Sequence, residues 1–298
     1  SLNHLCWSYL LFKCAALLKN EQPFAAIAET TLKLVLANAD NKNEKLDPLW
    51  ILIEQWLNNR GQSDPLPSPL ELPENIHDSS TALAGYRSEE QHVVCTLHGE
   101  HTGLGALRYR DVEIVTYGPQ HLPLGECSGF GIEGNALSDH GVRRSMIEWK
   151  RNSFILKGCT RLVDQPATSS SLLGDFRGIW LEVSQEFKRP HFYLKTSFLG
   201  LDGWNSVAMS FFVKAAFCKI NDSTLHPRTL DRYNGNADTV ILQGNEGAME
   251  LRPLGFEGVM HIIPLAGGDS FWGADFLIAY LMDSNQRHYQ WHTGPLNN

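Results

Sequence analysis

The stretch from Gln91 to His121, QHVVCTLHGEHTGLGALRYRDVEIVTYGPQH, carries the pattern that decides the fold. Apolar and polar residues alternate in HVVCTL and again in ALRYRDVEIVTYG, and a glycine-bearing segment separates the two runs. Successive side chains of a strand point to opposite faces of a sheet, so this alternation is typical of strands with one face on a core. The stretch therefore predicts a β-hairpin.

The same pattern continues from Thr81 to the end of the chain. Roughly ten short runs are apolar or alternating, glycine and asparagine occur between them, and none has a helical period. Many short strands joined by turns are typical of two stacked antiparallel sheets. We therefore expect a mostly β protein, with a large antiparallel β-sandwich over residues 81–298.

The first part of the chain has a different composition. Residues 1–61 predict three helices, in LNHLCWSYLLFKCAALLKN, FAAIAETTLKLVLANAD and LDPLWILIEQWLNN. Residues 62–80 contain four prolines and no periodicity, which predicts a linker. Because the sequence begins without Met and enters a helix at once, we expect residues 1–61 to be the end of a larger all-α domain.

Composition argues against several classes of protein. The net charge of −8 and the pI near 5.8 argue against nucleic acid as a partner, because phosphate binding requires a basic face. No apolar run reaches the length of about 18 residues that would predict a membrane span. The six cysteines form no CxxC pair, so a zinc finger or ribbon is not expected, and their apolar neighbours predict buried free thiols.

Histidines are concentrated in the opening stretch, which contains four of the twelve. Histidine is the usual acid, base or metal ligand near neutral pH, so this stretch is a candidate site. Strand alternation places His98 and Glu100 on one face and His101 on the other. A divalent metal site formed by these three residues would require a bulge at Gly99 or Gly103. No other cofactor is expected.

The segment HGEHTGLGALRYRDVEIVTYGPQ, together with the order of helices, linker and strands, resembles the heparinase II/III-like polysaccharide lyases. In that family an α/α toroid precedes a sandwich, and an HxHxDxLSF-like strand turns into a second strand. Glu100 stands where the family has its second His and Thr102 where it has Asp, so the metal-binding part of the motif is not reproduced. The positions that can be aligned with the family pattern are His98, Leu104, Leu107 and residues 112–118.

The resemblance implies eliminative cleavage of an acidic polysaccharide. That reaction needs a group that neutralises a carboxylate, a base and an acid, and His, Tyr and Arg can share these tasks. On this interpretation His98, His101 and Tyr109 are the expected catalytic residues.

Residues elsewhere are expected to bind the oligo- or polysaccharide. Asn3 and His4 look like the Asn/His pairs that some toroid lyases present to a substrate carboxylate. Arg143 follows a glycine-rich acidic segment and could hold an anionic sugar. Trp204 and Trp272 lie in the loops GLDGWNS and AGGDSFWGAD, where a flat apolar ring can stack on a sugar.

Two alternatives remain open at this point. The sandwich could be a non-catalytic module that binds glycans or proteins, with ordinary polar histidines. It could also be a glycoside hydrolase that uses loop carboxylates such as Glu126, Glu133 and Asp139.

Overall fold

The computed structural model describes residues 2–19, 22–42, 53, 74–98, 103–121, 143–161, 180–199, 207–255, 257–265, 273–281 and 288–296. The chain forms two compact units, Ser1–Pro73 and Glu74–Asn298.

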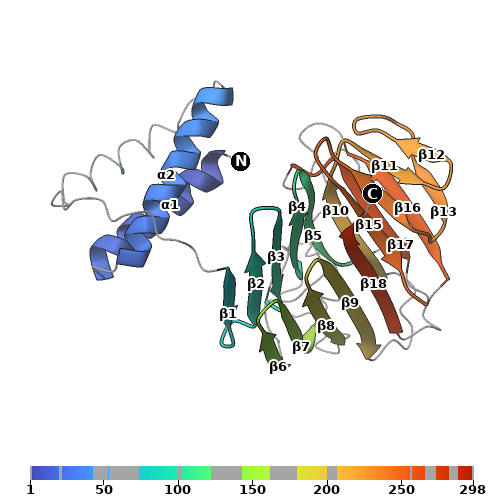
Figure 1. Cartoon of the computed structure of the whole chain (residues 1–298), viewed down its shortest axis with the longest axis horizontal. Helices are drawn as coiled ribbons and strands as arrows, with labels where there is room; N and C mark the ends of the chain where they lie inside the picture. The colour runs from blue at the N-terminus through green and yellow to red at the C-terminus, as the bar shows by residue number, and fades with distance from the viewer. Residues whose placement is uncertain are drawn as a thin grey trace, which may run out of the picture. The chain divides into compact units, whose positions relative to one another are not determined.

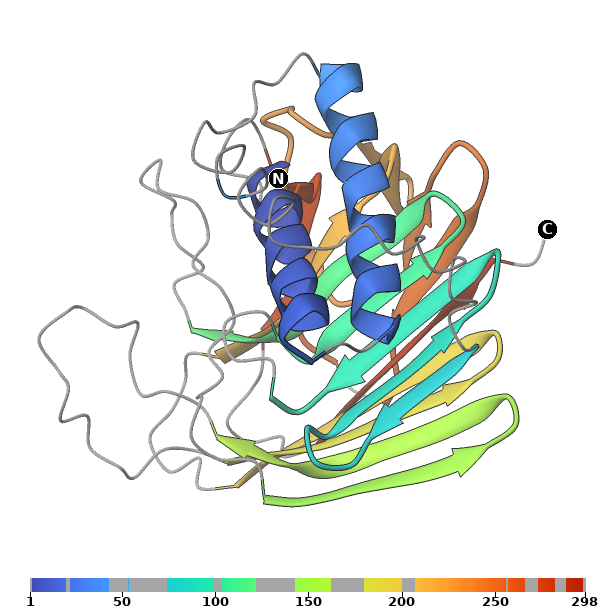
Figure 2. The same ribbon diagram turned by 90° about the vertical axis from the view of Figure 1, so that its left-hand side faces the viewer.

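The first unit contains helices α1 (Leu2–Lys19) and α2 (Gln22–Lys42), which lie side by side (Figures 1 and 2). Small residues at the start of α2 allow a close approach, and the buried side chains between the helices are Cys6, Tyr9, Leu10, Ala28 and Val35. Of the third predicted helix, only Ile53 falls within the described residues; it is helical and packs on this cluster. Neither helix combines the length and the apolar character needed to cross a bilayer.

The second unit consists of two antiparallel sheets, each with nine strands among the described residues (Figure 1). The first sheet has the order β1 (Asn75–Asp78), β2 (Leu83–Arg87), β3 (Gln91–Thr96), β4 (Gly105–Tyr109), β5 (Val112–His121), β10 (Val207–Lys214), β17 (Phe276–Leu281), β16 (Val259–Pro264) and β13 (Tyr233–Asn236).

The second sheet begins with β12 (Ser223–Leu225), β11 (Phe217–Ile220), β14 (Val240–Gln243), β15 (Ala248–Pro253) and β18 (His288–Pro295). It continues with β9 (His191–Leu199), β8 (Trp180–Lys188), β7 (Ser153–Arg161) and β6 (Arg143–Lys150). The prediction of a mostly β chain with a large antiparallel sandwich and a short helical region is confirmed.

The main core lies between the two sheets. Along β8 buried and more exposed residues alternate as the sequence predicts, and Leu181, Val183 and Phe187 face inward. The largest side chains that are fully buried come from both sheets: Trp291, Tyr117, Tyr280, Phe154, Phe187 and Phe211. This mutual burial of two apolar faces is the main stabilising contribution to the unit.

The outer face of the first sheet is also apolar and buried around β10 and β17. Ala208, Phe212, Leu277 and Ala279 form a second cluster on this face, and each has 0% exposure. Burial on both faces explains why VAMSFFV and ADFLIAYLM are continuous apolar runs rather than alternating ones.

Several strands were not predicted from the sequence. The first of them, β1, lies in the last residues of the segment 62–80 that the prolines predict to be a linker. The others are β2, β12, β13 and β18. The last of these, HYQWHTGP, contains a glycine and a proline, which are depleted in strands, and it pairs with β15 on one side and β9 on the other.

Candidate functional site

His98 does not lie on a strand, contrary to the sequence prediction. Strand β3 ends at Thr96, and the pairing of β3 with β4 ends at the Cys95–Gly105 pair. His98 is exposed two residues further on, where its backbone N–H donates to Oγ1 of Thr96 at 3.0 Å. Glu100 and His101 are outside the described residues, and no three or more His, Cys, Asp or Glu side chains among the residues that are described are placed so that they could hold a metal ion.

Most of the other predicted site residues also fall outside the described parts. Trp204 and Trp272 are among them, as are Glu126, Glu133 and Asp139 of the hydrolase alternative. For Asn3 and His4 in α1 and Arg143 in β6, the structure describes the backbone alone. Tyr109 is the predicted catalytic residue whose surroundings are fully described.

Tyr109 ends β4 and lines a pocket of about 380 Å³ at one end of the sandwich, here named the end pocket. The first sheet also contributes Ser88, Glu90 and Gln91, at the turn between β2 and β3. The second sheet contributes Arg189 and Pro190, from the turn between β8 and β9, and Pro295 of β18. The pocket therefore opens over the end of the core, between the two sheets.

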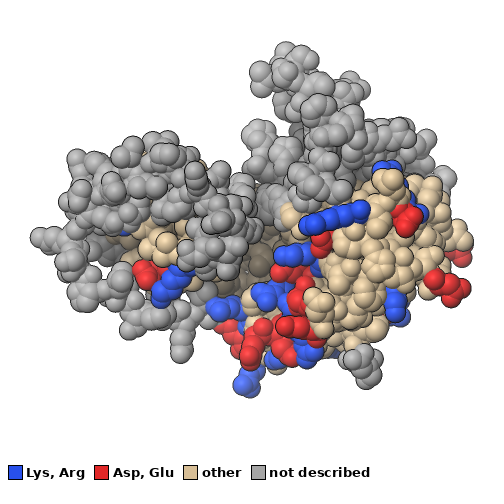
Figure 3. Space-filling view, turned by 90° about the horizontal axis from the view of Figure 1, so that it is seen from above, with Lys and Arg blue, Asp and Glu red and all other residues tan. Residues whose placement is uncertain are grey.

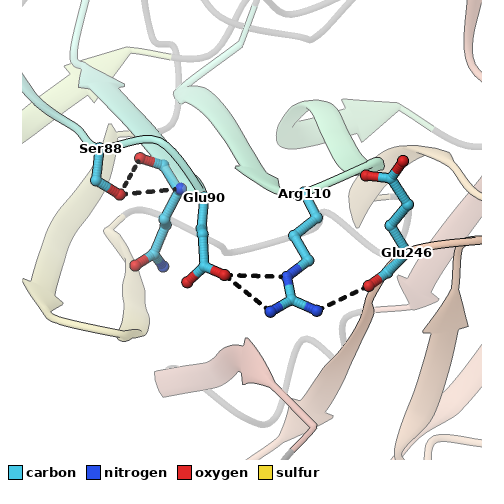
Figure 4. Close-up of polar contacts among 5 residues, drawn as sticks. Ser88, Glu90, Arg110 and Glu246 are labelled. Atoms are coloured by element: carbon cyan, nitrogen blue, oxygen red, sulfur yellow. Dashed lines mark hydrogen bonds and ion pairs between the residues drawn. The ribbon is translucent and has the colours of Figure 1, made fainter.

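A clamp of two turns borders this pocket (Figure 4). The Arg110 guanidinium donates to Glu90 Oε1 from Nη2 at 2.8 Å, and its Nη1 donates to the Glu246 carbonyl at 2.9 Å. The neighbouring Asp111 carboxylate accepts hydrogen bonds from the backbone N–H groups of Asn245 and Glu246. The turn after β4 is thus fastened to the turn after β14 in the opposite sheet.

Inside the pocket, Gln91 connects the sheets in a similar way. It is 7% exposed, and its Nε2 donates to the Pro190 carbonyl at 2.7 Å. Its backbone N–H donates to Ser88 Oγ at 3.1 Å. These bonds hold the lining in a defined arrangement.

A second group of titratable side chains, which was not predicted from the sequence, lies on the outer face of the second sheet. His292 of β18 is 4% exposed, and its Nε2 lies 3.1 Å from Nδ1 of His191 in β9. Its Nδ1 lies 3.1 Å from Glu250 Oε1 in β15, an ion-pair distance, although the N–H is not aligned on that oxygen. The three residues form a chain from carboxylate to imidazole to imidazole.

Gly294 makes room for this chain. A Cβ added there would lie 2.5 Å from Nδ1 of His191, closer than non-bonded atoms can approach. The absence of a side chain at this position lets the His191 ring lean towards His292, where the two ring centroids are 5.1 Å apart.

Burial lowers the pKa of His292, with Glu250 opposing the shift and with His191 and Arg252 adding to it. The ring is therefore neutral at pH 7 and has one N–H. We place that proton on Nδ1, because this atom lies beside the Glu250 carboxylate, which can only accept; Nε2 of His292 then accepts from Nδ1–H of His191. In its neutral form His191 then presents a lone pair on its other nitrogen, Nε2.

Two further side chains flank the chain of histidines. Tyr193 lies two residues after His191 on the same face, with its ring centroid 4.9 Å from that of His292. Arg252 is exposed and pairs directly with His292 across β15 and β18. We name His191, Tyr193, Glu250, Arg252 and His292 the histidine face. On the face seen in Figure 3, the described acidic and basic side chains of the β unit lie beside one another and are not segregated by sign.

Sequence reasoning missed the histidine face because its members come from three strands. His191 and His292 are 101 residues apart, and they meet because β18 pairs with β9. The usable signal was the alternation in HFYLKTSFL, which places His191 and Tyr193 on the polar face of a strand. Strand β18 was not predicted, so the sequence offered no basis for placing His292 beside His191.

The chain was compared with known proteins. It matches no protein-family model and no curated protein sequence. The heparan sulfate lyase HepC from Pedobacter heparinus is similar with a TM-score of 0.48 and 8% sequence identity, over 100% of this chain and 52% of that protein. This chain thus spans about half the length of that lyase. A galactose mutarotase related enzyme from Lactobacillus acidophilus has a TM-score of 0.34 and 6% identity, over 72% of this chain and 97% of the enzyme. Both resemblances in fold are weak, and neither assigns an activity.

Proposed function

We propose that this protein is a carbohydrate-active enzyme that cleaves an acidic glycan by β-elimination at the histidine face. The observation that carries the proposal is the chain from Glu250 through His292 to His191, with Tyr193 beside it. A base whose orientation is set by a second and a third group is the arrangement expected where protons are transferred.

The reaction balances without an oxidant or a metal. A base removes the proton at C5 of a uronate, next to the carboxylate, and the C4–O bond to the neighbouring sugar breaks. The electron pair of the C5–H bond forms a C4=C5 double bond. The leaving oxygen takes a proton from an acid, so one new reducing end and one unsaturated end result.

The histidine face contains a residue for each of these tasks. His191 Nε2 is the base, and His292 with Glu250 orients its ring and stabilises the positive charge that develops on it. The Tyr193 hydroxyl is the acid for the leaving oxygen. The Arg252 guanidinium faces solvent on the same side and suits the carboxylate, because a fixed cation stabilises the charge that builds up when the C5 proton leaves.

The spacing of these side chains matches one sugar unit and its linkage. Alternate residues of a strand lie about 6.7 Å apart, which separates His191 from Tyr193, and neighbouring strands lie about 4.8 Å apart. A single uronate ring can therefore lie over His191 with its leaving oxygen towards Tyr193. A long Arg252 side chain two strands from Tyr193 can reach the carboxylate of that ring.

The test is a screen of acidic polysaccharides for unsaturated products, which absorb in the ultraviolet. We expect activity on at least one uronate polymer, and a loss of about 100-fold or more in His191→Ala, the size usual for removing a general base. His98→Ala is the comparison variant, because it removes the exposed histidine that the sequence predicts to be catalytic in the hairpin. If His98→Ala abolishes turnover and His191→Ala does not, the reaction belongs to the hairpin and the proposal is wrong.

The site residues that were predicted from the sequence alone are tested separately. His98, His101 and Tyr109 stay predictions as catalytic residues, and His98, Glu100 and His101 stay a prediction as a divalent metal site. Metal analysis of the purified chain tests the predicted metal site. If the protein contains no metal and is fully active, that prediction is wrong.

A non-catalytic glycan-binding module is the second candidate function. The specific observation in its favour is the end pocket, which places the Tyr109 ring beside polar side chains from both sheets. Glycan retention without any eliminative product would support this alternative. The hydrolase alternative, which uses loop carboxylates such as Glu126, Glu133 and Asp139, stays a prediction, because these three residues lie outside the described residues.

A further inference from the structure

We infer that the end pocket is a binding site, separate from the histidine face, for one sugar ring that bears a carboxylate, a hexuronate unit. The choice of an acidic sugar rests on the proposed function, whereas the pocket itself rests on its own geometry. Its volume of about 380 Å³ is at the small end of the range for ligand pockets, roughly 300–1,000 Å³, which suits one ring rather than several.

The charges around the pocket favour an anion. The Glu90 carboxylate is neutralised by Arg110, which contacts it through two nitrogen atoms. The Arg189 guanidinium lies over the Tyr86 ring, 5.7 Å from its centroid, and forms no ion pair with any residue that the structure describes. The pocket therefore has one cation left to pair with a ligand, and a guanidinium binds a carboxylate through two parallel hydrogen bonds.

The rest of the lining suits a sugar ring. The Tyr109 ring and the rings of Pro190 and Pro295 provide apolar surface from opposite sheets, against which the C–H groups of a pyranose can pack. Ser88 and Glu90 add a hydroxyl and a second carboxylate oxygen at the rim, which can bond to sugar hydroxyls.

The lining is held in place before any ligand arrives. Gln91 is bonded to Pro190 across the sheets, and the Arg110 clamp fixes the turn next to Tyr109. A pre-formed site loses little conformational entropy on binding. Weak but measurable affinity for a small ligand is therefore expected.

The experiment is calorimetric titration of the full chain with glucuronate and, separately, with glucose. We expect glucuronate to bind at least about 10-fold more tightly than glucose, the factor that one charge-assisted pair provides. Arg189→Gln should abolish that preference. Arg232→Gln, an exposed arginine outside the pocket, is the matched control and should retain it.

A second pair of variants tests the ring contacts and guards against misfolding. Tyr109→Ala should lose glucuronate binding, whereas Tyr109→Phe, which keeps the ring, should bind as the wild type does. Thermal unfolding of each variant checks that the sandwich is intact. Equal affinities for glucuronate and glucose in the wild type, no binding of either, or no effect of Arg189→Gln would each overturn the inference.

Failure of this inference is distinguishable from failure of the proposed function. A monosaccharide has no glycosidic bond at O4 to break, so the titration measures binding without turnover. His191→Ala should bind glucuronate like the wild type even though it lacks the proposed base. Cleavage without pocket binding would overturn the end-pocket site alone, and pocket binding without cleavage would overturn the lyase alone.

Discussion

At the scale of single residues, one buried hydroxyl joins the two sheets. Tyr117 of β5 is fully buried, and its hydroxyl donates to Oε1 of Gln185 in β8, whose amide donates to the Thr96 carbonyl at 3.0 Å. Burial raises the pKa of Tyr117 well above its usual range, so the phenol stays protonated as a donor. The bond matters because Gln185 has no access to water.

Tyr117→Phe should destabilise the protein by about 1–3 kcal/mol, because it leaves a buried amide oxygen of Gln185 without its donor. Urea unfolding followed by circular dichroism measures this change. Tyr233→Phe is the control, since the Tyr233 hydroxyl bonds to the Asn236 carbonyl at an exposed position and its loss should cost less than about 0.5 kcal/mol. Equal effects of the two substitutions would show that the buried bond has no special role.

His292 gives a prediction about pH, because burial lowers the pKa of this residue in the folded state. The unfolded chain takes up a proton at His292 as the pH falls through about 6.5. In the folded chain, His292 takes up its proton only at a lower pH. The free energy of unfolding should therefore be highest above about pH 6.5 and should fall as the pH decreases below it, until the lowered folded pKa is passed.

His292→Gln should flatten this dependence between pH 7 and pH 5, although His92 and His261 also have pKa values lowered by burial and will keep part of the slope. At pH 8, His292 is neutral in both the folded and the unfolded state. A difference in denaturation midpoint between wild type and variant at that pH therefore measures only the change in packing. An unchanged slope in the variant would contradict the assignment of a neutral, buried imidazole.

At the scale of elements, turns rather than strands join the sheets at the end pocket. Asp111, in the turn after β4, accepts from two backbone N–H groups of the turn after β14. Gly244 permits this approach, because a Cβ there would overlap the Asp111 carboxylate. The clamp explains how a surface loop can keep the rim of a pocket in place.

Asp111→Ala should lower the free energy of unfolding by about 1 kcal/mol, since the freed N–H groups are exposed and can turn to water. It should also weaken glucuronate binding, because the turn next to Tyr109 loses its anchor. Glu113→Ala is the control. It removes an exposed pair with Arg108 whose atoms are 3.9 Å apart, and such pairs contribute little. A larger effect of Glu113→Ala than of Asp111→Ala would contradict this role of the clamp.

At the scale of the whole molecule, the fold class was predictable from the sequence and most of the site was not. Strands with alternating or apolar runs were found, because burial on one or both faces leaves a local pattern. Strand β18 was missed, because the glycine and proline of HYQWHTGP, residues depleted in strands, obscure the alternation of Tyr289, Trp291 and Thr293. Tyr109 was named from the sequence and does lie in a pocket, but Arg189 and Pro295 reach that pocket from the other sheet.

The histidine face illustrates the limit most clearly. It depends on the order β15, β18, β9 in the second sheet, in which no two neighbours follow each other in sequence. Local patterns indicate which face a side chain occupies, but they do not indicate which strand lies beside it. Glu250 and His191 could therefore be assigned to polar faces of predicted strands, but not to one another, and His292 lies in a strand that was not predicted.

The central claim is that His191 removes a proton from an acidic sugar, and chemical rescue tests it most directly. The measurement is the rate of ultraviolet-absorbing product from a uronate polymer by His191→Ala, with and without added imidazole. The account predicts that the variant loses about 100-fold or more of the wild-type rate and that free imidazole restores part of it, by supplying the missing base in the vacated space. A wild-type rate in His191→Ala, or a loss that imidazole leaves unchanged, would contradict the account.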